Sequence, residues 1–264
     1  MLNFLKMLRR TPRVTVTPSN GRAIIIPFRA ASVFLILILL VLSGFLALRS
    51  DLFLVRNFKV EIAGSSLSKG FIDSAVIRES LQKFSSRSII FIDQKEIAKT
   101  VVDASLVIET AQITKIFPDT LTVKIQLRQA VAEVVNGENH FLVDKGGFIF
   151  AKSPSNVSLP QINLLDGEAI GIGQSLNPAL VQNAIKVIVE LGRRNLFKIK
   201  SINLPKDQSI VVLAENDLTI FFRSNATILW QAQSLEAILQ KAKLEKGKLV
   251  KVDFRFERPV VVFQ

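Results

Sequence analysis

The chain has 264 residues and a formal net charge of +12, from 34 Lys and Arg against 22 Asp and Glu. It contains no cysteine, which excludes disulfides, thiol catalysis and thiolate metal sites. Six of the positive charges lie in residues 1–29, where there is no acid, and the others are scattered, so we expect no nucleic-acid binding.

Residues 30–48 form an uncharged, strongly apolar stretch. At about 1.5 Å per residue, a helix of this length spans roughly 28 Å, close to the hydrocarbon thickness of a bilayer. A cleaved signal peptide is the alternative, but residues 45–49 lack the small-x-small cleavage site that it requires. We therefore predict a single transmembrane helix over residues 30–49. The positive-inside rule places the basic tail, residues 1–29, in the cytoplasm and the remainder outside it.

Residues 53–128 show the pattern of one compact unit with elements in the order β-α-α-β-β. Ser68 is suited to cap a helix that runs to Phe84, and Asp93 is suited to cap a second helix. Two helices should therefore cover one face of a small sheet. Its strands are expected over residues 58–62, 107–116 and 121–127.

The two ends of this unit carry a resemblance. Phe58–Gly64 (FKVEIAG) and Phe117–Val123 (FPDTLTV) are similar to the first strand and the last turn and strand of a POTRA domain. A POTRA domain directly after one N-terminal membrane helix resembles the FtsQ/DivIB family of bacterial division proteins. A membrane-anchored POTRA protein that serves envelope transport or secretion is the alternative.

Residues 129–264 extend the resemblance to the β-domain of the FtsQ type. Residues 141–150 predict a hairpin around Asp-Lys-Gly-Gly, one helix is expected to begin with Asn177 as N-cap, and another contains Trp230. The alternation in residues 250–256 predicts a last long strand that matches the family's closing segment. We thus predict an α+β chain with a mixed β-sheet domain and two helices at its end. Further strands are expected over residues 199–204, 209–214 and 218–222.

No catalytic, cofactor-binding or metal-binding residue is predicted. His140 is the only histidine and is expected in a hairpin loop, where a lone histidine is more often solvated than catalytic. No Ser-x-x-Lys or Gly-x-Ser-x-Gly motif is present. An anchored enzyme is therefore the third possibility, behind a scaffold and a transport protein.

A partner-binding site is predicted near the last residues. The segment after Pro259 is apolar and uncharged, and because proline is rare in central strands, it is expected at a sheet edge. A partner strand could pair with its open backbone groups, whereas the alternative is that its side chains fill the core. The resemblance implies that FtsB, which arrives with FtsL, docks here, and Arg255 and Phe256 match the family's Arg–aromatic pair. Alternation puts these two side chains on opposite faces, with Arg255 toward the partner. The predicted partner-binding residues are Arg255, Phe256, Val260, Val261, Val262 and Phe263.

The expected function is that of a non-enzymatic membrane scaffold of the bacterial divisome. The resemblance implies a place in the cytoplasmic (inner) membrane at the division septum, with the C-terminus extracytoplasmic. It also implies contacts with FtsB- and FtsL-like proteins and other divisome components, and a part in the control of septal peptidoglycan synthesis. Besides these proteins, the lipid bilayer is an expected partner, and no cofactor is expected.

Overall fold

The structure is a computed structural model that describes residues 28–48, 51–155, 157–164, 170–244 and 247–264. Residues 51–264 form one compact unit, and helix α1 (Phe28–Leu48) lies outside it. The side chains of residues 32–46 of this helix are exposed. Most of the predicted basic tail, residues 1–27, lies outside the described residues. In the described ranges, no helix is long and apolar enough to cross a membrane.

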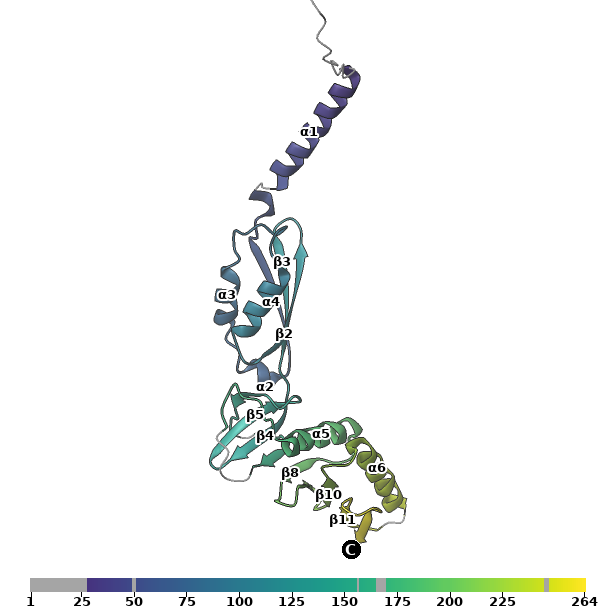
Figure 1. Cartoon of the computed structure of the whole chain (residues 1–264). Coiled ribbons are helices and arrows are strands. Elements are labelled where there is room, and N and C mark those ends of the chain that lie inside the picture. Colours follow the sequence, from purple (N-terminus) through teal and green to yellow (C-terminus); the bar gives the residue numbers. More distant parts are fainter. Residues whose placement is uncertain (1–27, 49–50, 156, 165–169, 245–246) are drawn as a thin grey trace, which may run out of the picture. The chain divides into compact units, whose positions relative to one another are not determined.

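A three-stranded sheet forms the first part of the compact unit. The central strand β3 (Thr120–Leu127) pairs in parallel with β1 (Asn57–Ala63) and antiparallel with β2 (Ile108–Ile116). Helices α3 (Ser74–Gln82) and α4 (Gln94–Asp103) cover one face of this sheet (Figure 1). The predicted β-α-α-β-β order is confirmed. Every second side chain of β3 enters the core. The fully buried side chains of β3 are Leu121, Val123, Ile125 and Leu127.

The helical region after β1 differs from the prediction of one helix capped by Ser68. A short helix, α2 (Ser66–Lys69), comes first, and α3 then begins with its own cap, Asp73. Ser68 lies inside α2 and is buried, and its hydroxyl donates to the carbonyl oxygen of Arg128 at 2.6 Å. The prediction for the next helix is confirmed: Asp93 caps α4, and its carboxylate accepts a backbone N–H at 2.9 Å.

A nine-stranded mixed sheet forms the rest of the unit, in the order β12-β11-β10-β9-β8-β7-β4-β5-β6. Helices α5 (Ala179–Arg194) and α6 (Ile228–Leu244) pack against it and close its main core. The α+β class with a mixed sheet and two helices is thus confirmed. Its strands are β4 (Ala130–Asn136), β5 (Asn139–Asp144), β6 (Ile149–Lys152), β7 (Gln161–Asn163), β8 (Ile199–Asn203), β9 (Ser209–Ala214), β10 (Thr219–Arg223), β11 (Leu249–Asp253) and β12 (Val260–Phe263).

The two sheets share buried residues. Leu142 and Phe150, from the predicted hairpin β5–β6, belong to the same apolar cluster as the core of the three-stranded sheet. Next to them, the guanidinium of Arg128 donates to Asp144 Oδ2 at 2.6 Å and lies 4.2 Å from the ring centre of Phe148. The predicted boundaries, residues 53–128 and 129–264, stay a prediction.

Two details of the helices differ from the sequence expectations. Pro178, rather than Asn177, occupies the N-cap of α5, so the helix begins one residue later than predicted. Trp230 lies in α6 as expected, but it is 48% exposed. Ala232 and Leu235 of α6, rather than Trp230, belong to the main core. A large aromatic surface is therefore left near the last strands of the sheet.

Candidate partner-binding site

Strand β12 is an edge of the nine-stranded sheet. It pairs antiparallel with β11, with Val261 opposite Val252, and it has no other partner strand among the described residues. Val261 packs in part against the main core, whereas Val260, Val262 and Phe263 are 44–45% exposed. The core-filling alternative thus applies to Val261 only, and in part.

The direction of the backbone groups of β12 follows from its last contact. The N–H of Gln264 donates to the carbonyl oxygen of Lys248 at 2.9 Å, so this N–H points toward β11. Backbone groups alternate in direction along a strand, so the N–H of Val262 also faces β11, and those of Val261 and Phe263 face away from the sheet. The outer side of β12 therefore offers open hydrogen-bonding groups beside uncharged side chains.

The predicted last strand, residues 250–256, is too long. Strand β11 ends at Asp253, because the Asp253 carboxylate accepts the backbone N–H of Arg255 at 3.1 Å and turns the chain out of the sheet. The strict alternation assumed for Arg255 and Phe256 therefore does not apply. Phe256 is 57% exposed and lies between β11 and β12 in the chain.

Arg255 is held by neighbouring side chains. Its Nε and Nη2 donate to the two oxygens of Asp253 at 3.0 and 2.8 Å, and its Nη1 donates to Asp207 Oδ2 at 3.2 Å. Its guanidinium carbon lies 4.3 Å from the ring centre of Phe221, and Lys251 Nζ lies 3.5 Å from Asp253 Oδ2. We name these five residues the Arg255 cluster.

The charges of the Arg255 cluster stabilise one another. Burial by itself would raise the pKa of the Asp253 carboxyl, but the hydrogen bonds and positive charge of Arg255, with the charge of Lys251, outweigh it and lower that pKa. Hydrogen bonds from Ser209, followed by those from Arg255, lower the pKa of Asp207. The hydrogen bond to Asp253 is the main reason that the pKa of Arg255 is raised. Asp207, Asp253 and Arg255 are thus ionised at neutral pH.

The supporting residues of this cluster were not among the predicted site residues. Asp253 and Arg255 are two positions apart on an expected strand, so a same-face ion pair was readable from the sequence. Asp207 and Phe221 come from other strands and loops, and no local pattern links them to Arg255. Trp230 adds to this surface, because its ring lies 6.3 Å from that of Phe254.

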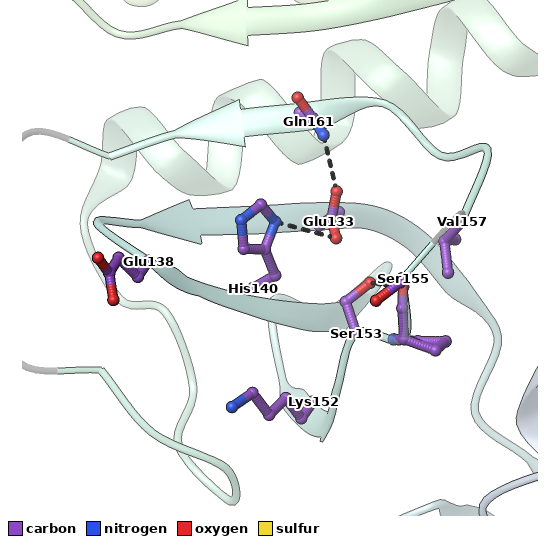
Figure 2. A pocket seen from close by; sticks show the side chains of 9 residues that line it. Glu133, Glu138, His140, Lys152, Ser153, Ser155, Val157 and Gln161 are labelled. Atoms are coloured by element: carbon purple, nitrogen blue, oxygen red, sulfur yellow. Dashed lines mark hydrogen bonds and ion pairs between the residues drawn. The ribbon is translucent and has the colours of Figure 1, made fainter.

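A hollow of about 440 Å³ lies over β4, β5 and β7, away from the Arg255 cluster in the sequence (Figure 2). His140 Nδ1 lies 3.2 Å from Glu133 Oε1, and Gln161 Nε2 donates to Glu133 Oε2 at 2.9 Å. His140 is thus in strand β5 and paired, rather than free in a loop. The hydroxyl of Ser153, which also lines this hollow, donates to the carbonyl oxygen of Pro154 at 3.5 Å. In the described part of the chain, no group of three or more His, Asp or Glu could hold a metal ion.

The three-stranded sheet with two helices on one face, followed by a mixed sheet with an open edge, defines a POTRA-containing protein. Residues 59–128 match the family described as "POTRA domain, FtsQ-type", and residues 132–255 match "Cell division protein FtsQ/DivIB, C-terminal". The chain belongs to the FtsQ/DivIB family of cell division proteins, which are generally non-enzymatic.

Comparison with solved structures finds the major extracytoplasmic domain of the trans isomer of the bacterial cell division protein DivIB from Geobacillus stearothermophilus. The identity is 12% and the TM-score 0.28, over 45% of this chain and 95% of that chain. No curated protein matches the chain.

Proposed function

We propose that this protein is a non-enzymatic membrane scaffold of the bacterial divisome, which links division proteins and helps control septal peptidoglycan synthesis. Membership of the FtsQ/DivIB family supports the division role. The observation that carries the scaffold role is the open, uncharged edge of β12, because such an edge is suited to a partner strand rather than to chemistry.

The membrane attachment is part of this proposal. The uncharged residues 30–48 and the acid-free basic tail before them support a single-pass anchor with a cytoplasmic N-terminus and an extracytoplasmic C-terminus. The anchor would hold the compact unit at the cytoplasmic (inner) membrane, where septal wall synthesis is controlled. Membership of the FtsQ/DivIB family supports the proposed role at the septum.

The proposed partners are FtsB- and FtsL-like membrane proteins, and the proposed binding residues are Arg255, Phe256 and the whole of β12. A partner strand beside β12 would bond to the outward N–H groups of Val261 and Phe263. Exposed Phe256 and Trp230 supply apolar area of the kind that dominates binding at interfaces. Arg255 would fix the turn that leads into β12, and its partly exposed face could also meet the partner.

The test exploits the outward N–H of Val261. Val261→Pro removes this donor while it leaves the bonds from β12 to β11 in place, and Val261→Ala is the matched control that trims the side chain but keeps the N–H. One interface hydrogen bond contributes about 0.5–1.5 kcal/mol, so the proline variant should bind roughly 2- to 12-fold more weakly than the alanine variant.

The measurement is co-purification of FtsB- and FtsL-like proteins with the full chain from membranes, with the fluorescence of Trp230 as the check on folding. Equal recovery with the folded proline variant would exclude strand addition at β12. Recovery of secretion or transport machinery in place of division proteins would favour the alternative function. Midcell localisation, and filamentation on depletion, test the division role independently of the site.

A further inference from the structure

Large apolar side chains are exposed at one end of the three-stranded sheet, the end where β1 and β3 begin and β2 finishes. This placement is unusual because neighbouring residues of the same segments are buried: Ile89 and Ile92 enter the core, whereas Phe91 between them does not. Exposed apolar groups that gather in one place mark an interaction surface. The exposed residues are Leu52 (67%), Phe91 (72%), Ile116 (49%) and Phe117 (58%), and we name them the apolar tip.

The three segments that carry the apolar tip lie against one another. The ring of Phe53, next to Leu52, lies edge-on to that of Phe117, with 6.5 Å between their centres. Lys115 Nζ donates to the carbonyl oxygen of Ile90 at 3.1 Å, which joins the end of β2 to the loop that holds Phe91. A backbone bridge between Leu54 and Ser88 joins that loop to the residues before β1. The tip is therefore one surface.

The charged groups at this end fit a lipid headgroup layer. Lys115 has a long aliphatic stem that can lie along apolar surface while its ammonium stays in the polar layer. Arg56 is a second cation, and its guanidinium donates to the carbonyl oxygen of Asp51. The acid at the β2–β3 turn, Asp119, accepts hydrogen bonds from the side chains of Asn57 and Thr120 at 3.1 and 2.9 Å, so both of its oxygens have partners within the protein.

We propose that the apolar tip inserts into the interfacial layer of the bilayer, with Lys115 and Arg56 among the headgroups. This inference rests on the proposed membrane anchor. Only residues 49 and 50 lie between the end of α1 at Leu48 and Asp51, and the three Cα–Cα steps from Leu48 to Asp51 span at most about 11 Å, so the chain itself keeps Leu52 close to the membrane surface. Aromatic and aliphatic side chains beside cations are the composition that binds this layer. The sheet would thereby gain a second attachment besides its covalent tether.

The test uses single-tryptophan variants of the full chain in vesicles of phosphatidylcholine and phosphatidylglycerol with brominated acyl chains, which quench tryptophan only at close range. The natural tryptophan, the only one, is removed by Trp230→Phe. Phe117→Trp and Phe91→Trp report on the tip. The matched control is Leu106→Trp. Leu106 is also apolar and exposed (47%), but it precedes the start of β2, at the end of the sheet opposite to the tip. Leu40→Trp reports on the anchor.

The expected result is loss of fluorescence in brominated against ordinary vesicles at positions 117 and 91, with a blue-shifted emission, and no loss at 106. If position 40 is quenched but 117 and 91 are not, the tip does not insert and this inference is wrong, while the anchor stands. If position 40 is not quenched, the anchor itself fails, and the proposed function with it. Equal quenching at 106 would also contradict the proposal, because it would indicate non-specific adsorption.

Discussion

Arg255 offers the sharpest test of the reasoning about the candidate site. Arg255→Ala removes the two side-chain donors to the buried carboxylate of Asp253 and the contact with Phe221, while it keeps the backbone N–H donor of residue 255 and leaves Lys251 as the nearest cation. A buried polar group that loses its partner costs about 1–3 kcal/mol, and breaking a fully buried ion pair costs about 3–5 kcal/mol. Because the Arg255 side chain is 35% exposed, we expect the lower range, about 2 kcal/mol.

This loss should be visible as a shift in thermal unfolding. For a compact unit of the size of residues 51–264, 2 kcal/mol corresponds to a fall of roughly 4–8 °C in Tm. Trp230 is the natural reporter, because it is the only tryptophan and its ring rests edge-on against Phe254, next to both Asp253 and Arg255. Its fluorescence follows unfolding at the site itself.

Two further variants separate the ion pair from other effects. Arg255→Lys keeps the charge but loses the two-pronged geometry, so it should fall between the wild type and Arg255→Ala. Adding Asp253→Asn to Arg255→Ala removes the uncompensated charge, so the double variant should be more stable than Arg255→Ala alone. If Arg255→Ala leaves Tm unchanged, or if the double variant loses the sum of both single effects, Arg255 does not hold Asp253 as described.

Two other predictions concern stability. The pKa values of Asp253 and Asp207 are lower in the folded than in the unfolded chain, so the stability that these carboxylates contribute is complete above about pH 4 and is lost as the pH falls below that value. In denaturant unfolding followed by Trp230 fluorescence, the free energy of unfolding should therefore fall less in acid for Asp253→Asn than for the wild type. An equal fall for both proteins would contradict this prediction. In Gly64→Ala, the new methyl group would lie 2.8 Å from Leu127 Cβ, so this variant should destabilise the protein by about 1–3 kcal/mol. In Gly192→Ala, within α5, the new methyl group would meet no atom within 4 Å outside the local helix backbone, so thermal unfolding should show a gain of about 0.5–1 kcal/mol. The same sign for both glycine variants would refute the packing argument.

Several elements of the fold were predictable because their causes are local. The alternation of residues 121–127 gives β3 with its buried face, and the position of Asp93 before a helical pattern gives the start of α4. Such features depend on hydrogen bonds and side-chain periods within a few residues. The failure at Ser68 shows the limit, because a hydroxyl that suits a helix cap is instead used by Arg128, sixty positions away in the chain.

The candidate site divides in the same way. The sequence alone determined that residues 260–263 are apolar, uncharged and preceded by proline, and these properties suit an edge. The tertiary structure decided that β12 is the outermost strand, that Asp207 reaches Arg255, and that β11 ends at Asp253. It also gathered the apolar tip from three separate segments. These outcomes depend on which distant strands pair and on which charges share a buried space, and neither is encoded in any short stretch of sequence.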